Sequence, residues 1–245
     1  MRLLKLDDND NFKLTEDYAG GSVPRYAVLS YCWASDIDEV SMDDIEGGTA
    51  YTKTGYAKLR LFAQRAREDG LQHFWTNMCC VNRSHNLAIS DAIIDTFPWF
   101  KGSSKCYVYL SDVSAVDESK GSVVAREAQW QHSFENSRWF TRSWTLQELL
   151  APESVEFFSA EGRRLGDKRS LEDKIEYITG IPRAALRGAP LEGFSVDERI
   201  SWMKGRQSNR VESRAYALLG LSGVSMAIQY GEGEVNAFIR LRGEI

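Results

Sequence analysis

The chain has 245 residues, 43% of them hydrophobic and 27% charged, which is typical of a globular protein long enough to bury a core. Its formal net charge of -5 argues against a nucleic-acid binder and a polybasic membrane anchor, because both need a basic surface. No apolar run is long enough to span a bilayer, and the first residues lack a signal-peptide core. We therefore expect a cytoplasmic protein without a membrane span.

Four apolar runs, rich in aromatic and β-branched residues, predict buried strands. In chain order they are Tyr26–Tyr31, His73–Cys80, Lys105–Leu110 and Ser154–Ser159. Helical patterns lie between them, at Tyr56–Asp69, at Ala88–Phe100, which Pro98 should end or kink, and at Ser143–Leu150, which Ser143 can cap. Loops are predicted at Asp36–Thr54 and Ser114–Ser122. This alternation predicts an α/β fold with a parallel sheet flanked by helices.

After about Gly162 the pattern becomes mostly helical. The candidate helices are Ser170–Ile178, Ser195–Lys204, Val211–Leu221 and Glu234–Glu244. Gly231 and Gly233 lack the lysine and the preceding strand of a phosphate loop, so they predict a turn before the last helix. We interpret the chain as a single domain, with an α/β core over 1–162 and a helical extension over 163–245 packed on it.

The cysteines favour a structural role. Cys32, Cys79, Cys80 and Cys106 lie in or beside apolar, strand-like runs, which is typical of buried free thiols. A metal site or a catalytic thiol is the weaker interpretation, because neither the cysteines nor the histidines show metal-ligand spacing.

Ligands of open parallel sheets bind beyond the carboxyl ends of the strands. This rule selects Ser30 and Trp33 after the first strand, Arg83 after the second, and Ser111 with Asp112 after the third. Each of these positions has a plainer alternative. The serines could form turns, and Asp112 could cap a turn or a helix.

The segment Ser137–Glu148 is the richest in chemical groups. Trp144 offers a flat ring, Arg142 offers an anion-binding fork, and Glu148 is a carboxylate on an otherwise apolar helix. Burying a lone carboxylate is costly, so Glu148 either has a partner or takes part in chemistry. The alternatives are that Glu148 is solvated or paired with Arg142, and that the tryptophans belong to the core.

Three ordered blocks of this sequence resemble the heterokaryon-incompatibility (HET) domain. The family's opening L-S-x-x-W-G block is matched by Tyr26–Ala34, its W-x-D-x-x-C-I-(D/N) block by Trp75–Asn82, and its R-x-W-T-x-Q-E block by Arg142–Glu148. The ending AYALLGLSGV…YGEGEVNAFIRL is also similar, so the resemblance covers essentially the whole chain. Two positions depart from the family pattern. Ala34 replaces a glycine that could serve a positive-φ turn, and Asn77 replaces an aspartate, which removes a negative charge.

A shorter stretch resembles the S-x-W-C-x-x-E-L motif of TIR domains. Trp144, Glu148 and Leu149 match it, and Thr145 stands where the motif has Cys. This similarity implies a TIR-like, flavodoxin-like core, with Glu148 at the position of the catalytic glutamate of those TIR domains that hydrolyse NAD+. On the same analogy, Trp33 or Trp144 would stack a ring of the dinucleotide and Arg83 or Arg142 would face its pyrophosphate. Ser30, Ser111 and Asp112 would line the pocket.

The resemblance to both families implies a fungal programmed-cell-death effector that cleaves NAD+ when it self-associates, with NAD+ as a substrate and with no cofactor or metal. It also implies attached sensor domains of the NACHT/WD-repeat type. The competing hypothesis is a non-enzymatic oligomerisation module of an innate-immune-like receptor, in which Glu148 and Arg142 form a structural ion pair. A nucleotide-binding switch is the weakest hypothesis, because the sequence lacks a phosphate loop.

Overall fold

The computed structural model describes residues 1–7, 11–18, 22–33, 35, 37–115 and 130–245. Its centre is a mixed seven-stranded sheet of order β2-β1-β4-β3-β5-β6-β7. The four inner strands, β3 (Tyr26–Tyr31), β4 (His73–Trp75), β5 (Lys105–Tyr109) and β6 (Val155–Phe158), are parallel to one another. Every residue of β3 and β6 is buried, as expected for strands covered on both faces. The predicted α/β fold is confirmed.

The parallel strands follow the flavodoxin-like order. Counted in chain order among themselves, they lie as second, first, third and fourth, so the chain reverses direction across the sheet between β3 and β5. Val28 of β3 lies beside Trp75 of β4 on one side and beside Cys106 of β5 on the other. Such a reversal point opens a crevice at the carboxyl ends of the strands. The fold therefore places the ends of β3 and β5 at its natural binding position.

Three short antiparallel strands widen the sheet beyond the prediction. The strands β1 (Leu4–Leu6) and β2 (Phe12–Leu14) form a hairpin beside β4, and β7 (Arg164–Asp167) pairs with β6. The sheet is thus mixed, where the sequence predicted parallel strands. Strands of three or four residues are too short for alternation to reveal them.

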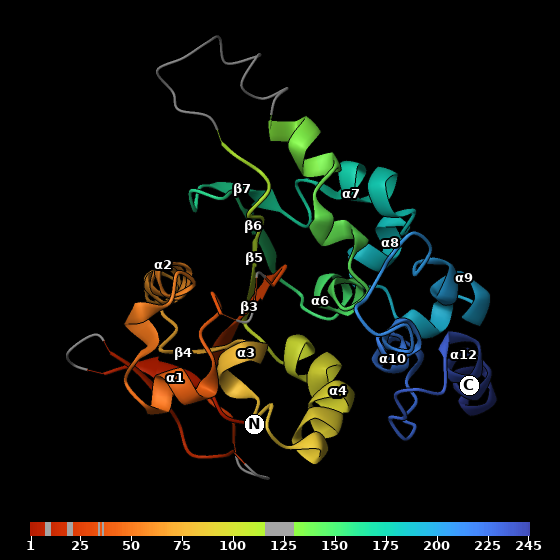
Figure 1. Cartoon of the computed structure of the whole chain (residues 1–245). Coiled ribbons are helices and arrows are strands. Elements are labelled where there is room, and N and C mark those ends of the chain that lie inside the picture. Colours follow the sequence, from red (N-terminus) through yellow and green to blue (C-terminus); the bar gives the residue numbers. More distant parts are fainter. Residues whose placement is uncertain (8–10, 19–21, 34, 36, 116–129) are drawn as a thin grey trace.

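Helices cover both faces of the sheet (Figure 1). The helix α2 (Tyr56–Glu68) covers one face and buries Phe62, whose ring stacks on Tyr107 at 5.8 Å between centroids. The helices α4 (Asn86–Lys101) and α6 (Thr145–Leu150) lie on the other face. The helix α4 continues past Pro98 to Lys101, so Pro98 does not end it where predicted.

Several local predictions need correction. The predicted loop Asp36–Thr54 contains α1 (Met42–Glu46), which a reciprocal capping box between Ser41 and Asp44 starts, and a 3-10 turn η1 (Ala50–Thr52). The second strand stops at Trp75, and its predicted end forms the one-turn helix α3 (Asn77–Cys80). Ser143 does not cap α6, because the helix begins one residue later, at an N-cap formed by Trp144. Part of the predicted loop Ser114–Ser122 lies outside the described residues.

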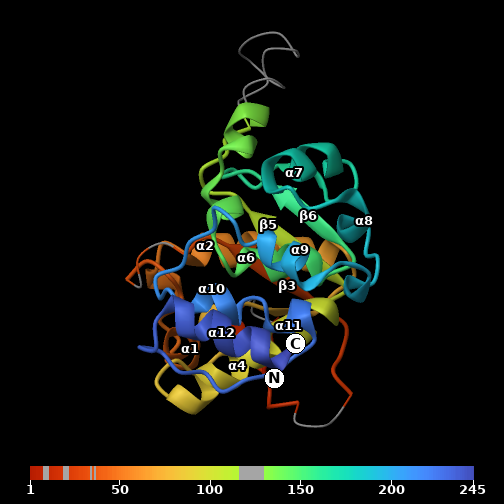
Figure 2. The same ribbon diagram turned by 90° about the vertical axis from the view of Figure 1, so that its right-hand side faces the viewer.

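The C-terminal region is mostly helical, as predicted, and packs on α4 and α6 (Figure 2). Its helices are α7 (Glu172–Thr179), α8 (Arg183–Leu186), η3 (Leu191–Gly193), α9 (Val196–Ser201), α10 (Ser213–Tyr216), α11 (Leu219–Ser222) and α12 (Glu234–Glu244). The single helix predicted at Val211–Leu221 is divided into α10 and α11. A Cβ at Gly220 of α11 would lie 2.1 Å from that of Phe97 of α4, so this glycine permits the close approach of the two helices.

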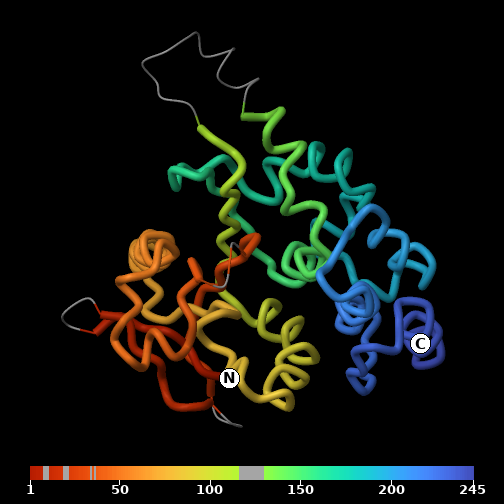
Figure 3. Tube along the Cα trace, in the orientation of Figure 1, coloured from red at the N-terminus to blue at the C-terminus, as the bar shows by residue number. Residues whose placement is uncertain are grey.

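The trace in Figure 3 brings the blue C-terminal segments beside the yellow and green segments of the core. Gly233 begins α12 at a φ of +83°, so the turn predicted at Gly231 and Gly233 is confirmed. Among the helices of the described residues, none is both long and apolar enough to cross a membrane.

Candidate functional site

A cavity of about 550 Å³ lies at the carboxyl ends of β3 and β4, and we call it the carboxyl-edge cavity. Its lining comes from both halves of the chain. The core contributes residues of β3, α3, α4 and α6, and the C-terminal region contributes residues between 209 and 230. A cavity is therefore present at the carboxyl ends of the strands, although among the described residues its strand lining comes from β3 and β4 and not from β5, and the helical extension forms part of its wall.

A buried relay of side chains lies at this cavity. Ser30, at the end of β3, donates a hydrogen bond from its hydroxyl to the Glu148 carboxylate, which reaches the cavity from α6. The indole Nε1 of Trp139 donates to the same Ser30 oxygen at 2.8 Å. Trp139 lies in η2 (Arg138–Thr141), and both Trp139 and Ser30 are 1% exposed. Two buried donors in series thus fix one oxygen of the carboxylate.

Burial raises the pKa of Glu148 to about 7. The Ser30 hydrogen bond and the nearby Arg206 guanidinium act in the opposite direction, because both stabilise the ionised carboxylate. A carboxyl group with a pKa near 7 exchanges between its charged and neutral forms at physiological pH. Such tuning suits a group that takes part in chemistry, although structural networks also produce it.

Arg206 is the cation whose charge acts on the pKa of Glu148, and its side chain is buried. Its Nη1 donates to the Arg142 carbonyl at 2.8 Å and to the Thr145 hydroxyl at 3.0 Å, and its Nε donates to the Trp202 carbonyl at 3.2 Å. Its Nη2 has no hydrogen-bond partner among the described residues. Burial lowers the pKa of Arg206 to about 10, so it remains charged and stabilises an anion at Glu148.

The predicted ion pair between Glu148 and Arg142 is not formed. The Arg142 guanidinium donates instead to the side-chain oxygen of Asn209 at 3.0 Å, and within the described part of the chain Glu148 has no ion-paired partner. The carboxylate is therefore neither fully solvated nor neutralised by a direct salt bridge. Its first partner is the hydroxyl of Ser30.

Most of the predicted supporting residues converge on the cavity. Trp33, Arg83, Arg142 and Trp144 line it, together with Glu148. Arg83 lies over the Trp33 ring at 4.9 Å from the centroid. Three segments far apart in sequence thus contribute aromatic and cationic groups to one cavity.

Ser30, Ser111 and Asp112, which were expected to line the pocket, are not among its lining residues, and Ser30 is connected to the cavity through Glu148. The Asp112 carboxylate accepts hydrogen bonds from the Ser137 hydroxyl and the Arg138 backbone N–H, both at 2.8 Å, at the start of η2. Asp112 therefore has the capping role that was its plainer alternative. It acts on the site indirectly, because η2 carries Trp139.

The structure describes one of the two positions that differ from the family pattern. Asn77 lies at the first position of α3 and lines the cavity, so the charge that it lacks would have been at the site. Ala34 lies outside the described residues.

Sequence reasoning missed the contribution of the C-terminal region. Asn209, Arg210, Ser213 and Tyr230 line the cavity, and none lies near a strand end. The segment that carries them is joined to the core, since Gln207 N–H donates to the Thr141 carbonyl at 2.6 Å and Ser143 N–H donates to the Gln207 carbonyl at 2.9 Å. Neither hydrophobic periodicity nor a sequence motif predicts this contact between the C-terminal region and the core.

The cysteines are free thiols, and Cys79, Cys80 and Cys106 are buried as predicted. Cys32 is half-buried and lines the cavity. Burial raises the pKa of Cys32 to about 11 and that of Cys80 to about 12, so both stay protonated at neutral pH and are poor nucleophiles. A search of the described residues finds no group of three or more His, Cys, Asp or Glu side chains that could hold a metal ion.

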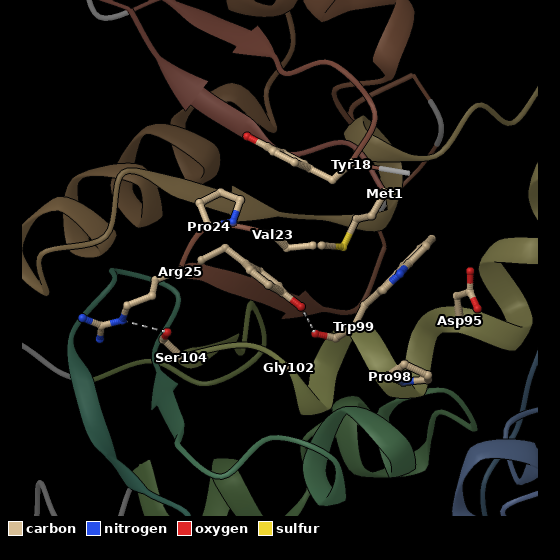
Figure 4. A pocket seen from close by; sticks show the side chains of 11 residues that line it. Met1, Tyr18, Val23, Pro24, Arg25, Asp95, Pro98, Trp99, Gly102 and Ser104 are labelled. Atoms are coloured by element: carbon tan, nitrogen blue, oxygen red, sulfur yellow. Dashed lines mark hydrogen bonds between the residues drawn. The ribbon is translucent and has the colours of Figure 1, made fainter. Parts of the chain in front are cut away.

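A second cavity, of about 580 Å³, lies at the opposite edge of the sheet, and we call it the amino-edge cavity (Figure 4). The residues just before and at the starts of β3 and β5 line it together with the last turns of α4. The Tyr26 hydroxyl donates to the Trp99 carbonyl at 2.6 Å, and Asp95 is exposed at its rim. Its lining lacks a carboxylate held by buried donors.

Comparison with known proteins places the chain in a family. No protein-family model matches it, and no solved structure matches it. The chain is 45% identical over all its 245 residues to "Vegetative incompatibility protein HET-E-1" of Podospora anserina. It spans 18% of the length of that relative. The identity extends through both the α/β core and the helical region, and the chain therefore belongs to the heterokaryon-incompatibility (HET) family.

Proposed function

We propose that this domain acts in heterokaryon incompatibility as a cytoplasmic cell-death effector, and that it does so by hydrolysing NAD+ at the carboxyl-edge cavity. The observation that supports the reaction is the Glu148 carboxylate at the wall of the carboxyl-edge cavity, which accepts a hydrogen bond from Ser30, whose hydroxyl in turn accepts one from Trp139. The name of the relative supports the biological role, since that protein is described as a vegetative incompatibility protein.

The chemistry needs one well-placed carboxylate. Cleavage of the bond between nicotinamide and C1′ of the ribose leaves the bonding electron pair on the nicotinamide nitrogen, so the leaving group departs neutral without a general acid. Positive charge then develops on the ribose ring, and ionised Glu148 stabilises it electrostatically. Water adds to C1′ and loses a proton, which gives ADP-ribose. The donors from Ser30 and Trp139 hold the carboxylate before the charge develops, so the site needs little reorganisation.

Two wider features belong to the proposal. Self-association is expected to promote activity, by analogy with TIR-like domains. The relative is much longer than the matched region, since the chain spans 18% of its length, and by this similarity we expect the domain to be joined to sensor domains of the NACHT/WD-repeat type.

The decisive experiment measures NAD+ consumption and nicotinamide release by the purified chain, both dilute and clustered by a fused oligomerising tag. Glu148→Gln keeps the size of the side chain and removes its charge, and we expect it to lower the rate at least about a hundredfold. The matched control is Glu68→Gln, which removes an exposed carboxylate of α2 that is ion-paired with Arg65. The control should retain the wild-type rate.

The outcomes separate the proposal from its alternative. Nicotinamide release that depends on Glu148 supports the enzyme. If the wild type consumes no NAD+ when clustered but still kills cells that express it, the domain acts as a non-enzymatic oligomerisation module. Glu148→Gln should then kill as well as the wild type does.

A further inference from the structure

The charged lining of the carboxyl-edge cavity favours an anionic ligand. Among the described residues that line it, the charged side chains are Arg83, Arg142, Arg210 and Glu148. Three cations and one carboxylate give a positive lining in a chain whose formal net charge is -5. The charge of the lining is thus opposite in sign to that of the chain as a whole.

Two of these arginines are held over aromatic rings from opposite halves of the chain. In the core, Arg83 lies over Trp33 at 4.9 Å from the ring centroid. In the C-terminal region, Arg210 lies over Tyr230 at 4.2 Å. Arg83 also donates from Nη1 to the Met78 sulfur at 3.0 Å. The fork geometry of a guanidinium matches phosphate oxygens, and stacking over a ring leaves that fork in the plane of the group.

Hydrogen bonds and ring packing fix the position of Tyr230 in the Arg210–Tyr230 pair. The Tyr230 hydroxyl shares a hydrogen bond with the Ser213 hydroxyl at 3.1 Å, and its ring packs edge-on against Tyr216. The Glu212 carboxylate accepts from the N–H groups of Gly231 and Gly233, which fixes the turn after Tyr230. Arg210 itself is exposed and forms no salt bridge among the described residues, although, after backbone hydrogen bonds, its charge helps to lower the pKa of the Glu212 carboxyl. Its exposed guanidinium is therefore accessible to a ligand.

The pair is also fixed relative to Glu148. The backbone hydrogen bonds of Gln207 to Thr141 and Ser143 join the segment before Arg210 to the segment before α6. The Arg142 side chain adds a bond to Asn209 at 3.0 Å. The C-terminal region thus carries Arg210 to the cavity through contacts a few residues from the carboxylate.

We infer that Arg210 and Tyr230 form, with Arg83 and Trp33, a two-sided clamp for the diphosphate of a dinucleotide whose ribosyl end reaches Glu148. The statement that the ribosyl end of the ligand is the one cleaved rests on the proposed function. The clamp adds a binding role for the helical region, which belongs to the ligand site and is more than a support for the sheet.

The test is calorimetric binding of ADP-ribose to the full chain, since ADP-ribose carries the diphosphate and has no nicotinamide bond to cleave. Arg210→Gln should weaken binding about tenfold, the loss expected for one charge-assisted hydrogen bond. Arg210→Lys should weaken it less, because lysine keeps the charge and loses the fork. The matched control is Arg187→Gln, a surface arginine that is ion-paired with Glu172 and does not line the cavity. Adenosine, which lacks the diphosphate, should bind equally to all variants.

Binding of ADP-ribose that depends on Arg210, with unchanged thermal unfolding of the variant, supports the clamp. Binding by Arg210→Gln at the wild-type affinity would overturn it, and so would the absence of ADP-ribose binding to the wild type. The result is separable from the proposed reaction, because it needs no turnover. A chain that binds ADP-ribose through Arg210 but does not cleave NAD+ keeps the clamp and loses the hydrolase.

Discussion

The two edges of the parallel sheet carry cavities of similar size, about 550 Å³ at the carboxyl edge and about 580 Å³ at the amino edge, but their chemistry differs. At the amino edge, the buried polar contact is a neutral one from Tyr26 to a backbone carbonyl, and the carboxylate of Asp95 is exposed. At the carboxyl edge, the partly buried carboxylate of Glu148 accepts a hydrogen bond from Ser30, and the Ser30 hydroxyl accepts one from Trp139. The volume of a cavity therefore does not distinguish the two edges, whereas the presence of a carboxylate held by buried donors does.

This difference follows from how parallel strands are connected. The chain departs from β3 and β5 in opposite directions across the sheet, and the side chains that follow the carboxyl ends of β3 and β4 line the cavity there, together with Glu148 of α6. At the amino edge the starts of β3 and β5 lie beside the last turns of α4, around a cavity whose lining lacks a carboxylate held by buried donors. We expect substitutions at the two edges to separate catalysis from stability.

The largest expected effect concerns the stability of Glu148→Gln. Folding raises the pKa of Glu148 from 4.5 to about 7, so the folded state favours the neutral carboxyl. The stability that this neutral form contributes is complete below pH 4.5 and is lost as the pH rises through 7. Glutamine never ionises, so above pH 7 the variant should be more stable than the wild type by up to about 3 kcal/mol.

Urea unfolding at pH 5 and pH 8 measures this effect. The amino-edge control is Asp95→Asn, whose exposed carboxylate should change the free energy of unfolding by less than about 0.5 kcal/mol. A loss of stability in Glu148→Gln at pH 8 would make Glu148 a structural partner and would remove the contrast between the two edges.

The next effect is the pH dependence of catalysis. If ionised Glu148 stabilises the developing positive charge, kcat/KM should follow the ionised fraction in the free protein. With a pKa of about 7, kcat/KM for NAD+ should fall about tenfold between pH 8 and pH 6. A flat profile over this range would mean that the ionisation of Glu148 does not control the reaction. Substitutions at the amino-edge cavity should not shift the midpoint.

The strand order explains why part of the site was predictable. Ser30 and Glu148 are 118 residues apart in the sequence. Ser30 was selected because it lies at the carboxyl end of a predicted strand, and Glu148 was selected because it is a carboxylate on an otherwise apolar helix. The long buried strands carried a strong sequence signal, and so did the helices between them. The rule places residues at an edge but does not say which way they face, and Asp112 accordingly serves η2 and not the cavity.

The unpredicted part of the site depends on tertiary contacts. Arg206, Arg210 and Tyr230 reach the site because the segment after α9 pairs with the segment before α6, and a single backbone bridge joins Arg142 to Gln207. The helix α1 had a readable signal in its Ser41–Asp44 capping box, which the glycine and acidic content of the segment obscured. The strand β1 and its hairpin partner are too short to show a pattern.

A smaller effect should come from Trp139, the donor to the Ser30 hydroxyl. Trp139→Phe removes the donor to Ser30 and leaves the ring's packing against Phe157 largely in place. The Ser30 hydroxyl then orients the carboxylate less well, so we expect kcat to fall about fivefold and stability to fall by about 1 kcal/mol. Trp99→Phe is the matched substitution at the amino-edge cavity, and its kcat should equal that of the wild type. Equal losses of kcat in both variants would show a general packing effect.

The smallest expected effect is at Tyr26, in the amino-edge cavity. Tyr26→Phe removes the hydroxyl that donates to the Trp99 carbonyl at 2.6 Å and keeps the ring. The lost hydrogen bond should lower the free energy of unfolding by about 1 kcal/mol, as measured by urea denaturation. The rate of NAD+ cleavage should not change, because the hydroxyl lies at the opposite end of β3 from Ser30. A change in rate without a change in stability would connect the two cavities along β3 and would contradict their independence.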